Sequence, residues 1–313
     1  MGSPEGLENT YPDESPQHTL ELPDFYISRY PVTNAQFRPF VEGDGYKERR
    51  YWTEEGWDWR QGKNPDLSMI EDEKIRGIYQ EWLEARPAER RDRPYWWGAP
   101  QWGASNRPVV GISWYEALAY CRWLEEQLVA VSSQQSAQEG LDQVYRRFWQ
   151  RLGTGELRLC LSSEVEWEKA ARGAMPSPPA PLPQGEGRVY PWGDQPDGER
   201  ANTKETGLEQ TSAVGIFPGG VSPYGVYDLV GNTWEWTRSR WGSNPKTPDF
   251  GYPYDTGDGR EDLSSLDFRI LRGGSFFDEQ SLARCGCRYW YVPVNVFSGI
   301  GFRMAASLAV SES

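Results

Sequence analysis

Apolar residues recur at helical spacing in four parts of the 313-residue chain. The expected helices begin near residue 33 and span 70–83, 113–131 and 163–173. Thr33 or Asn34 can cap the first of them, and Phe37, Phe40 and Val41 give it one apolar face. The last two start at capping boxes, in which a serine is followed three residues later by a glutamate.

Strand patterns are shorter. Residues 19–28 alternate between apolar and polar side chains and contain an edge proline, and 108–113 and 157–161 are short apolar runs. The 33 glycines and 24 prolines indicate many turns between these elements. We therefore expect a loop-rich α+β fold, with few regular elements and a single domain over residues 1–313.

Three stretches follow neither pattern. Residues 43–107 hold seven tryptophans among many charges and are expected to form an insert of long loops, while 174–186 is a proline-rich loop. The third stretch is 269–303, in which an Arg-Gly-Gly-Ser turn and an Ile-Gly-Phe-Arg strand enclose a segment rich in Tyr, Phe, Trp, Ser, Gly and Asn. That residue mixture is typical of a binding surface.

Composition excludes several function classes. The formal net charge of −13 argues against non-specific nucleic-acid binding, which requires a basic surface. No segment approaches the roughly 20 apolar residues of a membrane span, and the first residues lack the basic and apolar regions of a signal peptide. We expect no membrane insertion, a cytoplasmic location and a monomer.

Histidine and cysteine are scarce. The chain has one histidine, His18, which excludes paired-histidine metal sites built from this chain and is expected to be structural. Cys121 and Cys160 lie in apolar patterns and are expected to be buried thiols. Cys285 and Cys287 are two residues apart, where a disulfide would be strained, although a soft-metal or redox role stays open.

The strongest local signal is the segment 227–236, in which Asp228 and Glu235 flank a Gly-Asn turn. Calcium prefers carboxylates and backbone carbonyls on a sharply bent chain. A turn with an N-terminal acid explains the same spacing equally well.

Taken together, motifs along nearly the whole chain resemble one family. They are Val32-Thr-Asn, Val109-Val-Gly-Ile-Ser-Trp-Tyr-Glu-Ala, Ser163-Glu-Val-Glu-Trp-Glu-Lys-Ala-Ala-Arg-Gly, Pro191-Trp-Gly-Asp, Tyr224-Gly-Val-Tyr-Asp-Leu-Val-Gly-Asn-Thr-Trp-Glu-Trp-Thr, Leu271-Arg-Gly-Gly-Ser and Gly301-Phe-Arg. In this order they resemble the formylglycine-generating-enzyme, or sulfatase-modifying-factor, domain. The resemblance implies a C-type-lectin-like fold with little regular structure.

The resemblance also implies metal sites. A structural calcium ion would be held by the Asp228 and Glu235 side chains and by the carbonyls of Gly231 and Thr233. A second calcium site would fall on Asn202, Thr203, Glu205 and Leu208. The oxidase members hold copper with two cysteines, whose positions here are Asp278 and Ala283. We therefore expect no copper, no catalytic residues and no enzyme activity. The sulfoxide synthases of the family need a histidine-rich companion domain, and the single histidine argues against that branch.

A third branch of the family fits better, because the last stretch is similar to the variable region of diversity-generating retroelement proteins. The candidate variable positions are Phe277, Asp278, Cys287, Tyr289, Tyr291, Val292, Asn295, Phe297, Ser298 and Gly299. Trp290 lies among them and joins the predicted ligand contacts, although adenine-directed mutation of Asn codons cannot produce tryptophan. This branch implies a non-enzymatic protein that binds the surface of another protein at about 277–299. An oxidase-like enzyme and an accessory or sensor domain with a fixed partner are the alternatives.

Overall fold

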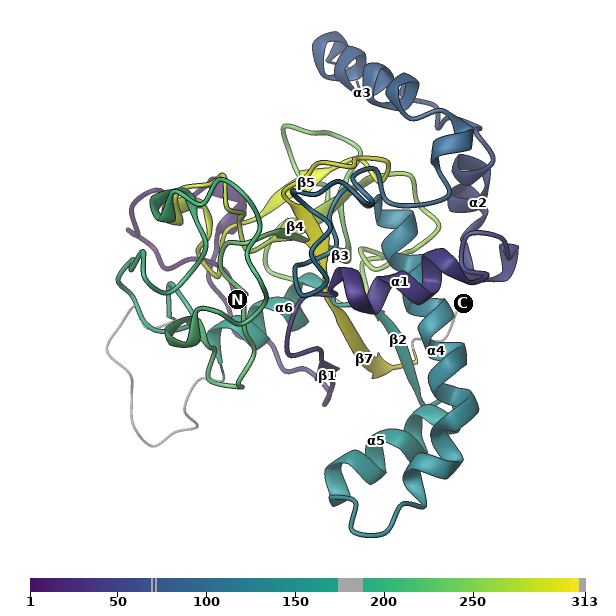
Figure 1. Cartoon of the computed structure of the whole chain (residues 1–313). Helices are drawn as coiled ribbons and strands as arrows, with labels where there is room; N and C mark the ends of the chain where they lie inside the picture. Colours follow the sequence, from purple (N-terminus) through teal and green to yellow (C-terminus); the bar gives the residue numbers. More distant parts are fainter. Residues whose placement is uncertain (69, 71, 174–187, 310–313) are drawn as a thin grey trace.

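The computed structural model describes residues 1–68, 70, 72–173 and 188–309, and these form six α-helices and two small sheets (Figure 1). The helices are α1 (Asn34–Glu42), α2 (Glu54–Arg60), α3 (Glu73–Ala85), α4 (Trp114–Ser136), α5 (Gln143–Gly153) and α6 (Glu164–Arg172). The strands are β1 (Tyr26–Ile27), β2 (Leu157–Leu161), β3 (Trp234–Gly242), β4 (Phe268–Arg272), β5 (Tyr289–Tyr291), β6 (Ile300–Phe302) and β7 (Met304–Leu308). The expected proline-rich loop at 174–186 lies outside the described residues.

The two sheets share the C-terminal part of the chain. In the three-stranded sheet, β7 lies between β1 and β2 and is antiparallel to both. The four-stranded sheet has the order β5-β4-β3-β6, with β3 parallel to β6 and antiparallel to β4. Glu235 at the centre of this sheet faces Arg272 on one side and Gly301 on the other. The two ends of the predicted variable region therefore flank the same strand.

The capping signals form the helices that the sequence predicts. The side-chain oxygens of Thr33, Ser113 and Ser163 accept hydrogen bonds from the backbone three residues later, at the starts of α1, α4 and α6. Gly173 ends α6, as expected, with a positive φ of 83°. The strand predicted at 157–161 is β2.

Other local predictions are wrong. Only Tyr26–Ile27 of the strand expected at 19–28 pairs with a neighbour. Residues 108–113 form no strand, because Pro108 makes a single bridge to Thr33 and the buried segment then turns into α4. Residues 108–113 are apolar because they are buried, although they form no ladder of backbone hydrogen bonds with another strand. The helices α2 and α5 were not predicted, although Asp142 caps α5 through the backbone N–H of Val144 at 2.8 Å.

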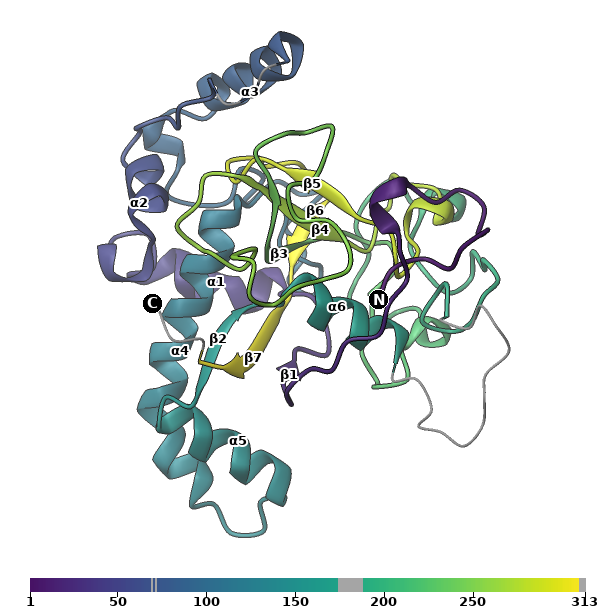
Figure 2. The same ribbon diagram turned by 180° about the vertical axis from the view of Figure 1, so that it is seen from behind.

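The tryptophan-rich insert is part of the main core. Trp52 and Trp59 of the insert belong to the same buried cluster as Trp114, Trp236 and Phe302. The ring centroids of Trp52 and Trp59 lie 6.4 Å apart, and Trp59 continues to Tyr115 of α4 at 6.2 Å. Tyr79 and Leu83 of α3 belong to the same buried cluster, although this helix lies at the periphery of the molecule in both views (Figure 2). No helix in the part of the chain that the structure describes is long and apolar enough to cross a membrane.

His18 ties the N-terminal segment to the 252–254 loop. Its ring Nε2 accepts a hydrogen bond from the backbone N–H of Tyr254 at 3.0 Å, so Nδ1 carries the proton and donates it to the Pro16 carbonyl at 3.0 Å. The ring also packs edge-on against Tyr252, with centroids 5.1 Å apart. Burial lowers the pKa of His18 below its usual 6.5. This arrangement matches the structural role expected from the sequence.

The lowered pKa of His18 predicts a pH dependence of stability. The folded chain disfavours the charged ring, so stability is lost as the pH falls below 6.5 and through the lower pKa of the folded state. His18→Gln removes this titration. Comparing urea midpoints of the parent and this variant at pH 7.5 and about pH 5 isolates it, because all other groups are common to both proteins. An equal loss of stability in both proteins would contradict the prediction.

Candidate functional site

A tight turn after β4 brings the predicted variable region against β3. Gly273 and Gly274 have φ values of 102° and 72°, which favour glycine. A Cβ on Gly274 would also lie 2.6 Å from the Cβ of Ala283. The Arg-Gly-Gly-Ser sequence is therefore required by both backbone conformation and space, and it delivers Ser275 and Asp278 to the end of β3.

Asp278 is the centre of the candidate site. Its Oδ2 accepts hydrogen bonds from the Trp234 indole N–H at 2.9 Å, from the Ser275 backbone N–H at 2.9 Å and from the Ser275 hydroxyl at 2.5 Å. The Trp234 ring stacks on Tyr289, with centroids 5.3 Å apart and planes 27° from parallel. One carboxylate thus joins β3, the turn after β4 and, through Trp234, the edge strand β5.

Four aromatic rings border this centre. Phe277 and Tyr289 are 47% and 43% exposed, and Tyr291 and Phe297 are half-buried. Phe277 contacts Phe297 with ring centroids 5.4 Å apart, and Tyr289 contacts Tyr291 at 5.3 Å. We call Phe277, Tyr289, Tyr291 and Phe297, with Trp234 and Asp278 between them, the aromatic face. Such rings offer a large contact area at a low cost in conformational entropy.

The other predicted contact residues do not reach this face. Cys287, Val292, Asn295, Ser298 and Gly299 are buried, so the prediction that they are exposed contacts is wrong. Val292 and Val294 join the main core, where Leu67 and Ile70 of the insert belong to the same cluster. The Asn295 Oδ1 accepts the Phe297 backbone N–H at 2.9 Å, and the Gly299 carbonyl accepts that of Trp234 at 2.8 Å.

Trp290 alternates with Tyr289 and Tyr291 along β5, and its ring lies nearly parallel to that of Tyr289 with centroids 6.2 Å apart. Its ring lies 4.8 Å from that of Phe268 and 6.1 Å from that of Trp241, measured between centroids. Trp290 is half-buried against the main core. It is therefore a packing residue of β5 rather than part of the aromatic face.

The thiols near the site are not positioned for chemistry. The side chain of Asp278 is held by hydrogen bonds, and Ala283, at the second cysteine position of the oxidase members, is fully buried. Cys285 and Cys287 are also buried, and burial raises the pKa of each thiol to about 12. A thiolate, the form that attacks or binds a soft metal, is therefore strongly disfavoured at both positions.

The residues of the first predicted calcium loop already have a cation. The Glu235 carboxylate binds the Arg303 guanidinium through Nε at 2.6 Å and Nη2 at 2.8 Å, and it accepts the Trp167 indole N–H at 2.6 Å. Arg303 also donates to the carbonyls of Tyr227 and Asp228 at 2.9 and 3.2 Å. The guanidinium thus supplies the positive charge that the prediction assigned to calcium.

The rest of that loop does not converge on a common point. Asp228 accepts the Gly215 backbone N–H at 2.7 Å, and burial raises the pKa of its carboxyl to about 6. The Gly231 carbonyl accepts the backbone N–H of Thr233 at 2.8 Å, and Thr233 itself is buried. Among the described residues, no group of three or more His, Cys, Asp or Glu side chains could hold a metal ion. The loop as folded does not fit calcium, so calcium binding here stays a prediction that would require Glu235 to leave Arg303.

The second predicted calcium site is also held by protein partners. Asn202 donates to the Gln210 carbonyl at 2.9 Å and is buried beside Gly231, while Thr203 is buried too. The Glu205 carboxylate accepts the Gln280 backbone N–H at 3.0 Å. Leu208 lies on the exposed surface beyond this turn. These contacts stabilise the turn in the structure, and calcium binding by Asn202, Thr203, Glu205 and Leu208 stays a prediction.

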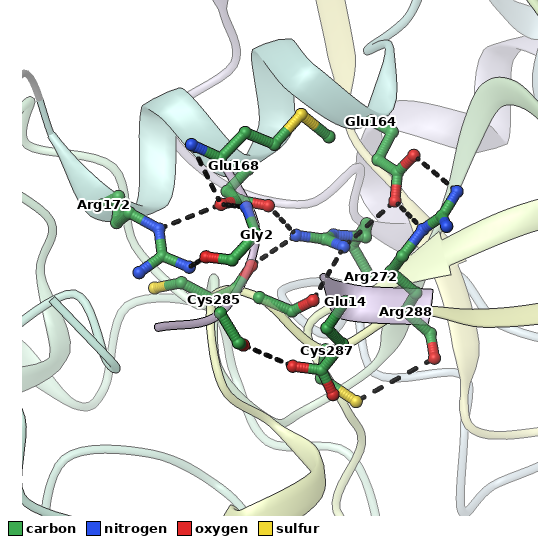
Figure 3. A network of polar contacts seen from close by, with 12 residues as sticks. Gly2, Glu14, Glu164, Glu168, Arg172, Arg272, Cys285, Cys287 and Arg288 are labelled. Carbon is green, nitrogen blue, oxygen red and sulfur yellow. Dashed lines mark hydrogen bonds and ion pairs between the residues drawn. The ribbon is translucent and has the colours of Figure 1, made fainter. Parts of the chain in front are cut away.

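A buried ion network behind the aromatic face was missed by sequence reasoning. Arg272 pairs with Glu164 at 3.1 Å and with Glu168 at 2.6 Å, and Arg288 pairs with Glu164 at 2.7 Å (Figure 3). Arg172 adds a second cation to Glu168 at 2.9 Å. The network joins α6 to β4 and to the segment that leads into β5. Arg272 directly precedes the turn that leads to Asp278, and Arg288 directly precedes Tyr289, so the network holds both segments that lead to the aromatic face.

Taken together, the fold and this site define a lectin-like scaffold with a C-terminal surface held by buried ion pairs. Residues 1–308 match the Sulfatase-modifying factor enzyme 1-like domain, and the chain belongs to that family. This confirms the fold class that the motifs predicted.

Relatives within the family differ in their named activities. The chain is 29% identical over 303 residues to a hercynine oxygenase of Mycolicibacterium smegmatis, a match that covers 96% of this chain and 56% of that protein. It is 27% identical to the inactive C-alpha-formylglycine-generating enzyme 2 of Bos taurus, covering 97% and 83%. The chain therefore spans about half the length of the hercynine oxygenase.

A solved structure shows the same fold. PvdO from Pseudomonas aeruginosa aligns with a TM-score of 0.57 and 22% identity, covering 98% of this chain and 90% of that one. At this identity the likeness concerns the fold alone.

Proposed function

We propose that the protein is a non-enzymatic ligand-binding protein whose aromatic face contacts the surface of another protein. The observation that carries the proposal is the environment of Asp278, where the oxidase members have a cysteine. Here a carboxylate fixed by Trp234 and Ser275 stands beside exposed aromatic rings instead of a reactive thiol. Rigid aromatic side chains on a hydrogen-bonded base are the features of protein-binding surfaces.

Diversification by a retroelement is the finer part of the proposal. We expect it first at the exposed Phe277 and Tyr289, and then at the half-buried Tyr291 and Phe297, which also pack against the main core. The source genome tests it: a near-copy repeat beside the gene and a reverse transcriptase are expected, with variation among isolates concentrated at these positions. A locus without the repeat would remove the diversification, and a face that is constant among isolates would favour a fixed partner.

Matched substitutions test whether side chains of the aromatic face can change without loss of stability of the fold. Phe277→Asn and Tyr289→Asn are expected to change the free energy of unfolding by less than about 1 kcal/mol, because both side chains are already exposed. Val292→Asn is expected to lower it by about 3 kcal/mol or more, because it places an amide in the main core. Urea unfolding of the three variants measures the contrast, and equal losses would refute the independence of the face.

A display library tests binding directly. Phe277, Tyr289, Tyr291 and Phe297 are randomised together and the library is selected against a purified protein such as lysozyme, with a library at four exposed residues of α5 as the control. We expect folded binders from the first library whose affinity is lost when the selected residues revert. Failure to obtain binders from well-folded members would overturn the proposal.

The hercynine oxygenase relatives favour a second candidate, in which the chain forms one half of a larger oxygenase. A non-haem iron site built from two histidines and a carboxylate cannot come from this chain alone, which has one histidine engaged in structural contacts. The second candidate therefore requires a histidine-bearing domain from elsewhere. Consumption of hercynine and O₂ with Fe²⁺, seen only when such a domain is added, would support it over the first.

A further inference from the structure

A hollow of about 520 Å³ lies on another part of the surface, between β1 and α6. Phe25, Ile27, Arg29, Lys169, Tyr224 and Val226 line it. None of these residues belongs to the aromatic face or to the ion network behind it. In both views β1 lies at the edge of its sheet and α6 runs nearby (Figure 1, Figure 2).

Part of the backbone of β1 faces this hollow. The Ser28 N–H donates to the Met304 carbonyl of β7 at 2.9 Å, and Ile27 stands opposite Ala305. In an antiparallel pair the hydrogen-bonding groups of successive residues point to opposite sides. Because Ser28 bonds to β7, the N–H and C=O of Ile27 point away from β7, toward the open edge.

The open edge is short because a neighbouring segment closes one end of it. The Tyr227 N–H donates to the Arg29 carbonyl at 2.9 Å, so the chain around residue 227 runs beside the outer side of β1 at that point. The Ser222 N–H then bonds to the Val226 carbonyl instead, as this segment turns back on itself. The hollow lies where the two backbones separate, and among the described residues no hydrogen bond is formed to the Ile27 N–H or C=O on that side.

The hollow carries an excess of positive charge on a strongly acidic chain. Within the described residues, Arg29 and Lys169 have no carboxylate within ion-pair distance, and they rest on aromatic rings instead. The Arg29 guanidinium lies 5.1 Å from the centroid of Tyr227, and the Lys169 ammonium lies 5.5 Å from that of Phe25. Asp24 is the single acidic residue among the described residues of the lining. Two cations against one carboxylate give a basic spot on a chain of net charge −13.

We propose that this hollow binds an extended acidic segment of a partner protein by strand addition to β1. The segment's main chain would hydrogen-bond to the Ile27 N–H and C=O, an interaction that open sheet edges provide. A carboxylate of the segment would lie between Arg29 and Lys169, and an apolar side chain two positions along, on the same face of the segment, would pack against Phe25 and Tyr224. Phe25, Ile27 and Arg29 are spaced by two residues and line the hollow from one face of β1, so every second residue of the added strand would face the hollow.

The test uses a fluorescein-labelled peptide, acetyl-Val-Thr-Glu-Thr-Val-Thr-Glu-amide, whose valines and glutamates share one face when it is extended, in fluorescence anisotropy titrations with the whole chain. We expect saturable binding that Lys169→Glu and Arg29→Gln each weaken by about tenfold or more. Lys74→Glu on α3 makes the same charge change at an exposed site remote from the hollow, and Phe277→Asn changes the aromatic face; both should bind as the parent does. Thermal unfolding of each variant confirms that it is folded, and Arg29→Gln preserves the test if Lys169→Glu does not fold.

Two further peptides separate strand addition from simple attraction of charge. A peptide with lysine in place of glutamate should not bind. A peptide with alternate backbone nitrogens methylated keeps every charge but loses hydrogen-bond donors, and it should bind at least about tenfold more weakly. The proposal would be overturned if the methylated peptide bound as tightly as the unmethylated acidic peptide. It would also be overturned if the unmethylated acidic peptide showed no saturable binding at about 1 mM.

Discussion

Replacing Arg272 with leucine is expected to lower the free energy of unfolding by about 4 kcal/mol, because it leaves buried carboxylates short of positive charge. The Arg272 side chain is fully buried, and it bridges Glu164 and Glu168, which are also buried. It further donates to the carbonyls of Cys285 and Gly286. Urea unfolding at neutral pH measures the change.

A second substitution separates the charge from the packing. Adding Glu168→Gln to Arg272→Leu removes one of the uncompensated charges, so the double variant should be more stable than the sum of the single changes predicts. Lys204→Leu is the matched surface control, because Lys204 pairs with Glu279 at 2.9 Å where both side chains are exposed, and it should cost less than about 0.5 kcal/mol. If Arg272→Leu costs no more than this control, the network is not what holds α6 to β4.

The buried ion network also makes the free energy of unfolding depend on pH in the acid range. Burial disfavours the charge of Glu168, but Arg172 and Arg272 outweigh it and hold the pKa of that carboxyl below its usual value. A depressed pKa contributes stability that is complete above the unfolded value of about 4.5 and is lost as the pH falls through the lower folded value. The loss from this group therefore begins only below about pH 4.5, under the range in which His18 acts.

Local signals in the sequence were sufficient for the elements whose ends are determined locally. Capping boxes at Ser113 and Ser163 place the starts of α4 and α6, because the bonds that they make span three residues. The apolar run at 108–113 led to a wrong prediction of a strand, because these residues are buried without forming a ladder of backbone hydrogen bonds with a neighbouring strand. Alternation at 19–28 could not tell how far a partner strand would follow, and β7 pairs with two residues of it.

The candidate site depends on contacts that no local pattern encodes. Asp278 was identified by its place after the Arg-Gly-Gly-Ser turn, but its bond to Trp234 joins residues 44 positions apart. The main core takes in both Val292 and the insert residues Leu67 and Ile70, which are more than 200 positions earlier. The sequence therefore predicted which segment forms the surface but not which of its residues are exposed.

In the predicted calcium loop, too, the decisive contact comes from a residue that is far away in the sequence, Arg303. Asp228 and Glu235 have the residue types and the bend that calcium prefers, and the chain between them folds as a turn around Gly231. Arg303 comes 68 positions after Glu235 and binds it fully buried. A cation from the single residue between β6 and β7 thus satisfies the carboxylate that the local pattern assigned to a metal.

Replacing Arg303 with methionine is expected to lower the free energy of unfolding by about 4 kcal/mol, because Glu235 then keeps a buried charge without its cation. The carbonyls of Ser28, Tyr227 and Asp228 would also lose the guanidinium donors. Glu235→Gln added to Arg303→Met should recover part of the loss, since a neutral amide costs less to bury and can keep the Trp167 indole as its donor.

Calcium provides the decisive comparison for this loop. If Asp228 and Glu235 can hold the ion once the guanidinium is removed, millimolar Ca²⁺ should raise the melting temperature of Arg303→Met and not that of Arg303→Met with Glu235→Gln. The effect should weaken as the pH falls below 6, because the raised pKa of Asp228 leaves its carboxyl protonated there and a protonated carboxyl is a poor ligand. Stabilisation of the unsubstituted protein by Ca²⁺ at neutral pH, abolished by Glu235→Gln, would mean instead that the ion displaces Arg303 in the native chain. An absence of stabilisation in every variant would mean that Asp228 and Glu235 do not hold calcium even when the guanidinium is absent.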